Sequence, residues 1–243
     1  MRYSRNKLAK YRVLKKSSEL ASALPSTYSM TKSHFQKLIS RYGKVIVKPS
    51  SGSGGIGVMS VVSQGGQSYK LHHGTSKKRI SGLSETYAYI KRKTKGASYI
   101  VQKKIRLAKV NGRPFDARVM AQRKRGSSEW VLTGQLAKIA GAGYIITNTA
   151  RSKGKVVPLS DAIRRSDVQG RSVSEIEHRV ESIGLKAARQ LHNYYRIRTV
   201  GLDVGIDNKG RVWIIEANFH PAKSLFLKLK NRSMYRRIVR YQK

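Results

Sequence analysis

The sequence predicts an α+β protein built from predominantly antiparallel sheets with helices packed on them. Three observations lead to this prediction. Short β-branched runs are separated by turn signals such as Gly65-Gly66, a pattern typical of β-hairpins. Other stretches repeat apolar residues every three or four positions, as helices with one buried face do. The hydrophobic fraction of 39% is enough to build a packed core in a chain of 243 residues.

The N-terminal hundred residues are expected to alternate helices with strands. A basic helix is expected over residues 6–23, with Pro25 ending it. Thr31 is suited to cap a second helix, which runs to Tyr42 and ends at Gly43. The remaining expected elements are strands over 44–48, 58–62 and 99–102 and a helix capped by Ser84 that runs to Lys93.

The rest of the chain is expected to form strands, a long helix and a hairpin. Strands are expected over residues 115–122 and 130–139, with a turn at Asn111-Gly112 before the first. Ser172 opens the long helix, and Glu175 completes a capping box with it. The last elements are a hairpin of strands 199–206 and 211–217 around the turn 207–210, and a basic helix over 222–241.

The charge balance is extreme, because 51 Lys and Arg residues face only 12 Asp and Glu residues and give a net charge of +39. Such a field attracts polyanions, which include nucleotides, acidic peptides, anionic wall polymers and nucleic acid. The sequence has no apolar run long enough for a membrane span and no secretory signal at its start. It has no cysteine, so disulfides and thiolate catalysis are excluded. We therefore expect a soluble intracellular protein with an anionic partner.

The few acidic residues are more informative than the many basic ones. Asp116, Asp203 and Glu216 each lie within an apolar run that is expected to be a strand. Each could be a strand-end acid paired with a surface Lys or Arg. A carboxylate kept inside a strand of so basic a protein is otherwise a candidate for a functional site.

A loop rich in glycine and serine joins two expected strands at residues 49–57. Glycines let backbone N–H groups approach phosphate oxygens, and serine hydroxyls add donors. Lys48 precedes the loop as a point charge for a phosphate. The loop is neither a P-loop nor a dinucleotide-binding turn, because a β-branched strand rather than a helix follows it. A flexible glycine hairpin without a ligand is the alternative.

The hairpin at residues 199–218 predicts a metal site. A two-residue turn at Asn208-Lys209 places Asp203 opposite Ile214, with Glu216 as its diagonal neighbour on the same face. Strand alternation puts Asn218 on that face as well. Two carboxylates and an amide are oxygen donors that suit Mg²⁺.

The strand over residues 115–122 adds a second polar pair. Asp116 and Arg118 are two residues apart, so both side chains lie on one face. An acid and a guanidinium that project together suit a ribose hydroxyl and a phosphate. A salt bridge between the two is the alternative.

Taken in order, these segments resemble the ATP-grasp superfamily, and more narrowly its YheC/YheD-type endospore coat-associated family. The resemblance covers nearly the whole chain. The segments that carry it are Asn6-Lys7-Leu8, Leu24-Pro25-Ser26-Thr27, Val45-Ile46-Val47-Lys48-Pro49 with the glycine loop, Ile100-Val101-Gln102-Lys103-Lys104-Ile105, Gly112-Arg113-Pro114-Phe115-Asp116-Ala117-Arg118-Val119, Thr147-Asn148, Gly201-Leu202-Asp203-Val204 and Glu216-Ala217-Asn218. Each segment alone is a weak signal, but their common order is a strong one.

The resemblance implies an ATP-grasp fold, in which two α+β lobes with antiparallel sheets clamp ATP. It implies a basic N-terminal helix over 1–24, a small lobe over 25–100 with the glycine loop, and a large lobe over 101–243 with the metal site and a basic C-terminal helix. Arg118 and Lys48 would be catalytic, and Asp203, Glu216 and Asn218 would hold Mg²⁺. The implied nucleotide-binding residues are Lys7, Lys48, Ser51, Gly52, Ser53, Gly54, Gly55, Ile56, Gly57, Gln102, Lys103, Ile105 and Asp116, with the hinge at Gln102 to Ile105 facing adenine.

By the same resemblance the protein is expected to be an ATP- and Mg²⁺-dependent carboxylate–amine ligase that forms an acyl phosphate. Its charge favours an anionic amino acid or peptide as substrate, and the family implies a cytoplasmic, spore-associated bacterial protein. The alternatives are a degenerate ATP-grasp module that binds polyanions as a structural spore protein, and a nucleic-acid-binding protein without catalysis. Two departures from the family are expected, namely no N-terminal pre-grasp domain and no Gly-Gly after Asn148.

Overall fold

Two antiparallel sheets form the framework of the computed structural model, which describes residues 3–52, 54–141 and 154–242. The strand order is β1-β6-β2-β3-β4-β5 in the first sheet and β10-β9-β8-β11-β12 in the second, where β7 also pairs with β8. Every strand pairing within the described part of the chain is antiparallel. The expected α+β class with antiparallel sheets is confirmed.

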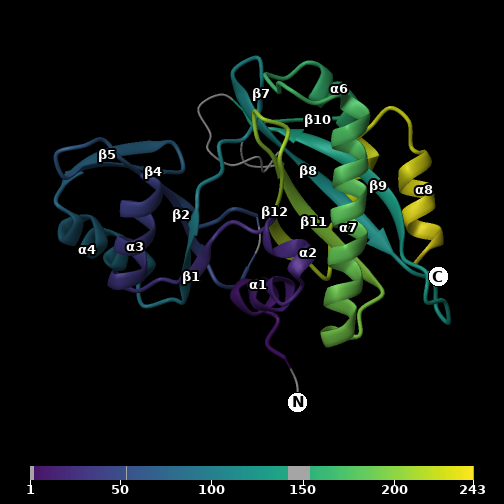
Figure 1. The fold of residues 1–243 in the computed structure, drawn as a ribbon, viewed down its shortest axis with the longest axis horizontal. Coiled ribbons are helices and arrows are strands. Elements are labelled where there is room, and N and C mark those ends of the chain that lie inside the picture. The colour runs from purple at the N-terminus through teal and green to yellow at the C-terminus, as the bar shows by residue number, and fades with distance from the viewer. Residues whose placement is uncertain (1–2, 53, 142–153, 243) are drawn as a thin grey trace.

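The first sheet has helices on one of its two faces (Figure 1). Its strands are β1 (Thr27–Ser29), β2 (Lys44–Pro49), β3 (Met59–Ser63), β4 (Ser68–His73), β5 (Ser76–Ser81) and β6 (Tyr99–Lys103). Helices α3 (Lys32–Tyr42) and α4 (Leu83–Thr94) enclose a core with it that includes Phe35, Val47 and Ile90. The boundary expected between the two lobes lies between residues 100 and 101, which is inside β6. The strand partners of β6 all belong to the first sheet.

The second sheet is covered on one face by a long helix (Figure 1). Its strands are β7 (Lys109–Val110), β8 (Arg113–Gln122), β9 (Val131–Ile139), β10 (Lys155–Val157), β11 (Thr199–Ile206) and β12 (Val212–Asn218). Helix α7 (Val173–Tyr195) packs on the sheet, and α6 (Leu159–Arg164), α1 (Lys7–Lys15) and α2 (Ser18–Ala21) pack against α7. The opposite face carries the candidate site together with η1 (Lys223–Lys228) and α8 (Ser233–Arg240).

Several local signals in the sequence are confirmed. The Thr31 hydroxyl accepts a hydrogen bond from the backbone of His34 and starts α3, while Ser172 and Glu175 form the expected capping box of α7. At the β7–β8 turn Asn111 and Gly112 both have positive φ, which is the geometry that an Asn-Gly hairpin requires. These signals succeed because each depends on neighbouring residues only.

Both expected terminal helices are wrong as single helices. The first is interrupted at Ser17, where the backbone becomes extended. The short helix α2 that follows places the Leu20 side chain in the core. The C-terminal one is interrupted where Leu229 becomes extended, so that Leu229 and Ile238 can both be buried on the second sheet. In each case burial of apolar side chains against the rest of the protein outweighs the continuation of a helix whose hydrogen bonds water can replace.

The expected cap of the helix at 84–93 is also wrong. Gly82, with φ of 84°, is its N-cap, and Ser84 lies inside the first turn of α4. Glycine is favoured there because this positive φ is strained for residues with a Cβ atom. No explicit expectation was made from the sequence for six elements, namely strands β1, β4, β5, β7 and β10 and helix α6.

Candidate functional site

Charged side chains from four strands gather on the face of the second sheet that α7 does not cover. In the sheet register Lys138 of β9 lies opposite Asp116 of β8, and Arg118 of β8 lies opposite Asp203 of β11. Asp203 in turn lies opposite Glu216 of β12. Residues paired across an antiparallel sheet project to the same face, so the register brings all five groups together.

The predicted register of the β11–β12 hairpin is wrong, and the true one is more favourable to a shared site. Asp203 faces Glu216 directly, whereas Ile214 pairs with Val204. The shift has two local causes. Asp207 accepts backbone hydrogen bonds from Lys209 and Arg211, which closes a wider turn than the expected two-residue one. A register shift between Asp203 and Val204 leaves one extra residue on β12.

Asp203 is the centre of a buried ion-pair network. One carboxylate oxygen accepts hydrogen bonds from Arg118 Nε at 2.9 Å and from Lys138 Nζ at 2.7 Å, and the other accepts one from an Arg118 terminal nitrogen at 3.2 Å. Lys138 also forms an ion pair with Asp116 at 3.2 Å. The expected same-face pair of Asp116 and Arg118 is therefore divided, because each is matched with an oppositely charged group on a neighbouring strand.

The electrostatics of this network favour the charged states of Asp203, Arg118 and Lys138. Burial alone would raise the pKa of Asp203, but the charges of Lys138 and Arg118 outweigh it and hold that pKa well below its usual range. Burial likewise opposes the charged forms of Arg118 and Lys138. Attraction to Asp203 nevertheless raises the pKa of Arg118, and attraction to Asp116 and Asp203 raises that of Lys138.

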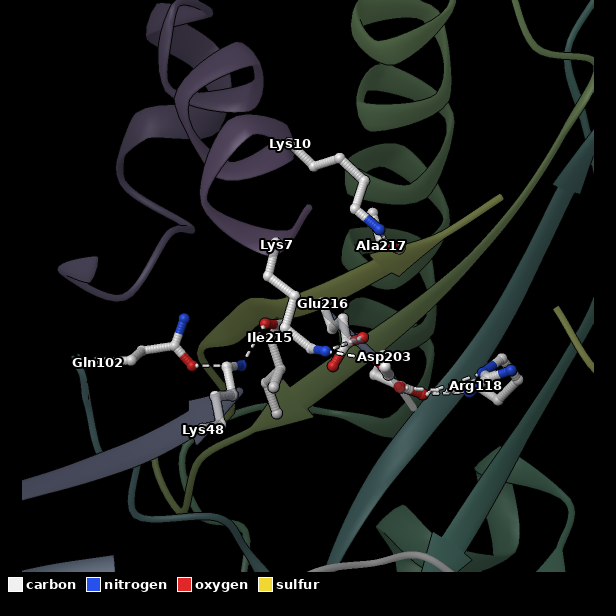
Figure 2. A network of polar contacts seen from close by, with 10 residues as sticks. Lys7, Lys10, Lys48, Gln102, Arg118, Asp203, Ile215, Glu216 and Ala217 are labelled. Carbon is white, nitrogen blue, oxygen red and sulfur yellow. Dashed lines mark hydrogen bonds and ion pairs between the residues drawn. The ribbon is translucent and has the colours of Figure 1, made fainter. Parts of the chain in front are cut away.

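Glu216 receives its positive partners from the N-terminal helix. Lys7 Nζ lies 3.6 Å from a Glu216 carboxylate oxygen (Figure 2). It also donates a hydrogen bond to the carbonyl of Gly52 at 2.6 Å. Lys10, also on α1, donates to the carbonyl of Ala217, the residue between Glu216 and Asn218. Burial lowers the pKa of Lys10, and the charge of Glu216 opposes that effect. Helix α1 thus connects the glycine loop to the end of β12.

Lys48 joins the two sheets at the same place. Its Nζ donates to the side-chain oxygen of Gln102 at 2.9 Å and to the carbonyl of Ile215 at 3.2 Å, as Figure 2 shows. Burial lowers the pKa of Lys48, while the negative charge of Glu216 opposes the shift. A buried lysine with two neutral acceptors keeps donor capacity for an anion placed between the sheets.

The other residues expected in the hinge are arranged differently from Gln102. Lys103 alternates to the opposite face of β6, where its ammonium lies 4.9 Å from the ring centres of Tyr42 and Trp213. Its backbone N–H donates to the carbonyl of Ser26. Ile105 follows the end of β6 and is partly buried. Lys103 therefore binds the two sheets together through aromatic rings, on the face away from Lys48.

The glycine loop lies between β2 and β3, as expected, and its base is well anchored. Backbone hydrogen bonds join Lys7 N–H to the Ser50 carbonyl and Ser50 N–H to the Ser98 carbonyl. Gly57 has φ of 71°, and a Cβ there would lie 2.5 Å from the Tyr99 hydroxyl, so only glycine fits. Ile56 at the tip is exposed. The expected loop residues Ser51, Gly52, Gly54 and Gly55 are described, whereas Ser53 and the Thr147-Asn148 segment lie outside the described residues.

A cleft opens between the loop and α1. Its volume is about 380 Å³, and Lys7, Lys10, Ser51, Gly52 and Glu216 are among the residues that line it. The lining combines hydroxyls, backbone groups and several ammonium groups with one carboxylate. Such a cleft suits a phosphate-bearing ligand accompanied by a cation.

The donor set on β11 and β12 fits a magnesium ion. No group of three or more His, Asp or Glu residues within the described ranges could hold a metal, so a site here needs the amide of Asn218 beside Asp203 and Glu216. Asn218 lies opposite Gly201 in the register, two residues from Glu216 on the same face. Among the described residues, the ion pair that Glu216 forms is the 3.6 Å contact with Lys7, and carboxylate oxygens accept more than one partner. Hard oxygen donors of this kind are what Mg²⁺ prefers.

Sequence reasoning missed two lysines of the site, Lys138 and Lys10. Lys138 lies in a strand whose neighbours Leu136, Ala137 and Ile139 are all buried, so a charged residue kept inside an apolar strand was the available signal. A charged residue inside an apolar strand is also the pattern by which Asp116, Asp203 and Glu216 were identified. Lys10 resembles any other basic residue of α1, and only packing of that helix on β12 distinguishes it.

Asp203→Asn is expected to destabilise the fold in a pH-dependent way. The change leaves two buried cations without their shared charge, so the free energy of unfolding at pH 7 should fall by about 3 kcal/mol. Because the folded pKa of Asp203 is depressed, its carboxylate contributes stability above an unfolded-state pKa of about 4, and this is lost as pH falls. The difference between parent and variant should therefore shrink in acid, as urea unfolding at pH 7 and pH 3 would measure.

Asp161→Asn is the matched control for that experiment. Asp161 is exposed and pairs with the exposed Arg164 at 3.1 Å. Exposed pairs contribute about 0–1 kcal/mol, so this variant should unfold almost as the parent does. Equal losses in the two variants, or a loss at Asp203 that does not change with pH, would contradict the network.

Comparison with known proteins agrees with this geometry. The model of the family described as YheC/D-like ATP-grasp matches residues 2–243. The endospore coat-associated protein YheD of Bacillus subtilis (strain 168) is 27% identical over 228 residues, which are 91% of this chain and 49% of that protein. The chain thus spans about half the length of this curated relative.

Solved structures with a similar fold are ATP-grasp proteins at low sequence identity. The C-terminal domain of K. lactis Pby1, an ATP-grasp enzyme, has a TM-score of 0.53 and 15% identity, over 94% of this chain and 66% of that one. D-cycloserine synthetase DcsG has a TM-score of 0.53 and 12% identity, over 96% and 70%. An L-amino acid ligase from Bacillus licheniformis has a TM-score of 0.50 and 12% identity, over 92% and 42%. The fold is therefore the ATP-grasp fold.

Proposed function

This chain belongs to the YheC/D-like ATP-grasp family, and from that premise we propose that it is an ATP- and Mg²⁺-dependent carboxylate–amine ligase. The solved relatives include an L-amino acid ligase and D-cycloserine synthetase, which supports ligase chemistry for the fold. The substrate proposed for this chain is an anionic amino acid or peptide. Spore association is proposed from the coat-associated relative.

The observation that carries the proposal is the direct pairing of Asp203 with Glu216 in a protein of net charge +39. Two carboxylates side by side repel one another, and the surrounding chain offers many cations that could have separated them. Arg118 and Lys138 neutralise Asp203, whereas the one ion pair that Glu216 forms among the described residues is its 3.6 Å contact with Lys7. A magnesium ion held by Asp203, Glu216 and Asn218 would stabilise this pair and neutralise charge on a bound triphosphate.

The other charged groups have roles that follow from their places. Lys48 and Lys7 would bind phosphate oxygens between the glycine loop and β12, and Gln102 would orient Lys48. Asp116 would accept a hydrogen bond from a ribose hydroxyl. Arg118 would stabilise negative charge on the transferred phosphoryl group, and Asp203 holds its guanidinium in place through two hydrogen bonds.

The reaction proposed for the site has two steps. A substrate carboxylate oxygen attacks the γ-phosphorus of ATP, so that an acyl phosphate forms and ADP leaves. An amine then attacks the acyl carbon, the amide bond forms, phosphate leaves, and the amine gives up a proton to solvent. Positioning and charge neutralisation account for most of the catalysis in such transfers.

A second candidate function is a degenerate module that binds polyanions as a structural protein of the spore. The net charge and the coat-associated relative favour it. Release of ADP and phosphate, screened against acidic amino acids and acidic peptides, distinguishes the two. A ligase releases both products only when acceptor and MgATP are present together, whereas a binding module releases neither under any condition.

The substrate class makes a separate prediction about salt. If the basic surface attracts the anionic substrate, KM for that substrate should rise several-fold between low and physiological ionic strength, because exposed charges are screened beyond about 8 Å. KM for MgATP should change less, since Lys48 is buried. Steady-state rates measured across a salt series test this. Neutral or basic acceptors used equally well, with no salt dependence, would refute the anionic substrate.

A further inference from the structure

The exposed charged side chains of the C-terminal segment are all cations. Seven side chains form this basic C-terminal face, and all are exposed: Lys223, Lys228, Lys230, Arg232, Arg236, Arg237 and Arg240. The chain has no acidic residue after Glu216. None of the ion pairs formed among the described residues includes any of the seven. Within the described part of the chain, the charge of this face is therefore not offset by ion pairs.

The segment that carries the face is fixed to the second sheet by apolar side chains. Phe226, Leu229 and Ile238 are buried against β8 and β9. The close approach depends on Gly134, where a Cβ would lie 2.7 Å from Phe226 and 3.1 Å from Ile238. The Gln122 amide donates to the carbonyl of Ile238 at 3.2 Å. Apolar anchors on one side and cations on the other give a rigid, preorganised charged surface.

Stability does not account for this arrangement. Arg236 and Arg240 are one turn apart on α8, and like charges at that spacing destabilise a helix. No carboxylate on the segment offsets the repulsion. A cost of this kind is expected where a negatively charged partner binds.

The basic C-terminal face begins at the candidate site. Pro221, which precedes it, packs on Gly201 so closely that a Cβ there would lie 2.4 Å from the Pro221 Cβ and 3.6 Å from Arg118 Cδ. Phe226 packs with Met120, which is two residues from Arg118 on β8, a separation of about 7 Å along a strand. A chain bound on the face could therefore reach Arg118 with its end.

We propose that the basic C-terminal face binds an acidic polypeptide and directs its end to the site beside Arg118. The proposal rests on the ligase function, because a polypeptide carries the terminal carboxylate and amine that a ligase joins. Single-stranded nucleic acid is less well matched, since its binding sites stack bases on aromatic rings. The segment offers no exposed aromatic side chain, because Tyr235 and Tyr241 are partly buried and Lys124 covers Tyr241.

The experiment measures binding directly and does not need turnover. A fluorescein-labelled polyglutamate peptide is titrated with the full chain, with the variant R236Q/R237Q/R240Q and with the control K77Q/K78Q/R79Q. The control removes the same charge from exposed residues of β5, at the opposite end of the molecule from α8 (Figure 1). Thermal melting of all three proteins shows that each variant folds, and MgATP binding is measured separately.

The α8 variant should raise the dissociation constant for polyglutamate about ten-fold, which corresponds to about 1.4 kcal/mol shared by three exposed ion pairs. The β5 control should change it less than about two-fold, and MgATP binding should be unchanged in both. Equal losses in the two variants would overturn the proposal, as would tighter binding of a DNA oligonucleotide of equal charge to the same face. If the protein binds polyglutamate but never hydrolyses ATP, the proposed ligase function is wrong while the proposed peptide-binding face is supported.

Discussion

Glu216→Gln should abolish turnover while the protein stays folded. The substitution keeps the volume of the side chain but removes one of two paired negative charges. Loss of a magnesium ligand should lower the rate by at least about 100-fold. ADP release at saturating MgATP measures this. A second readout is the rise in melting temperature on adding MgATP compared with ATP alone, which should largely disappear in the variant.

Glu19→Gln is the matched control, because Glu19 is an exposed glutamate that pairs with Lys186 on α7 at 2.5 Å. Its turnover should match that of the parent, since exposed pairs contribute little to stability and the residue is remote from the Asp203–Glu216 pair. If Glu216→Gln retains parental turnover at ordinary magnesium concentrations, then Asp203, Glu216 and Asn218 do not form a metal site. The ligase mechanism proposed above would then be wrong as well.

Lys48→Ala should weaken MgATP binding by about 1.5–3 kcal/mol, the contribution of a hydrogen bond that involves a charged group. Lys48 is buried between the sheets, where the low dielectric strengthens its attraction for phosphate. It also joins β6 to β12 through Gln102 and Ile215, so the variant should be less stable as well. Isothermal calorimetry measures the affinity, and a thermal melt shows whether the fold persists.

Two further variants separate the charge of Lys48 from its packing. Lys48→Met keeps most of the volume and should lose nearly the same affinity as Lys48→Ala. Lys44→Ala removes an exposed lysine from the same strand and should change affinity less than about two-fold. Unchanged affinity in both Lys48 variants would remove Lys48 from the nucleotide site.

The sequence indicated which carboxylates come together better than it indicated their geometry. Asp203 and Glu216 could be recognised because a carboxylate inside an apolar strand is unusual in so basic a chain. Their register could not be predicted, because Asp207 closes a wider turn and β12 carries an extra residue near Ile215. The resulting pairing is direct rather than diagonal, and that is the feature on which the metal proposal depends.

Two other parts of the site depended on contacts between distant residues. Lys10 and Lys7 reach the carboxylates only because α1 packs on β12, and Lys138 meets Asp203 only because β8 lies between their strands. Lys103 was expected near the nucleotide with Gln102, yet it lies on the other face of β6 with Tyr42 and Trp213. The sequence shows that side chains alternate between the two faces of β6. It does not show which of these faces lies toward the second sheet.

By itself the sequence determined the α+β class, the helix caps at Thr31 and Ser172 and the hairpin turn at Asn111, because these depend on interactions within a few residues. It also determined the family through the order of its segments. The interruption of both terminal helices and the partners of Asp203 were decided by the tertiary structure alone. Burial of apolar side chains and pairing of buried charges act between residues far apart in the chain, and their energies exceed the local preferences that a sequence pattern records.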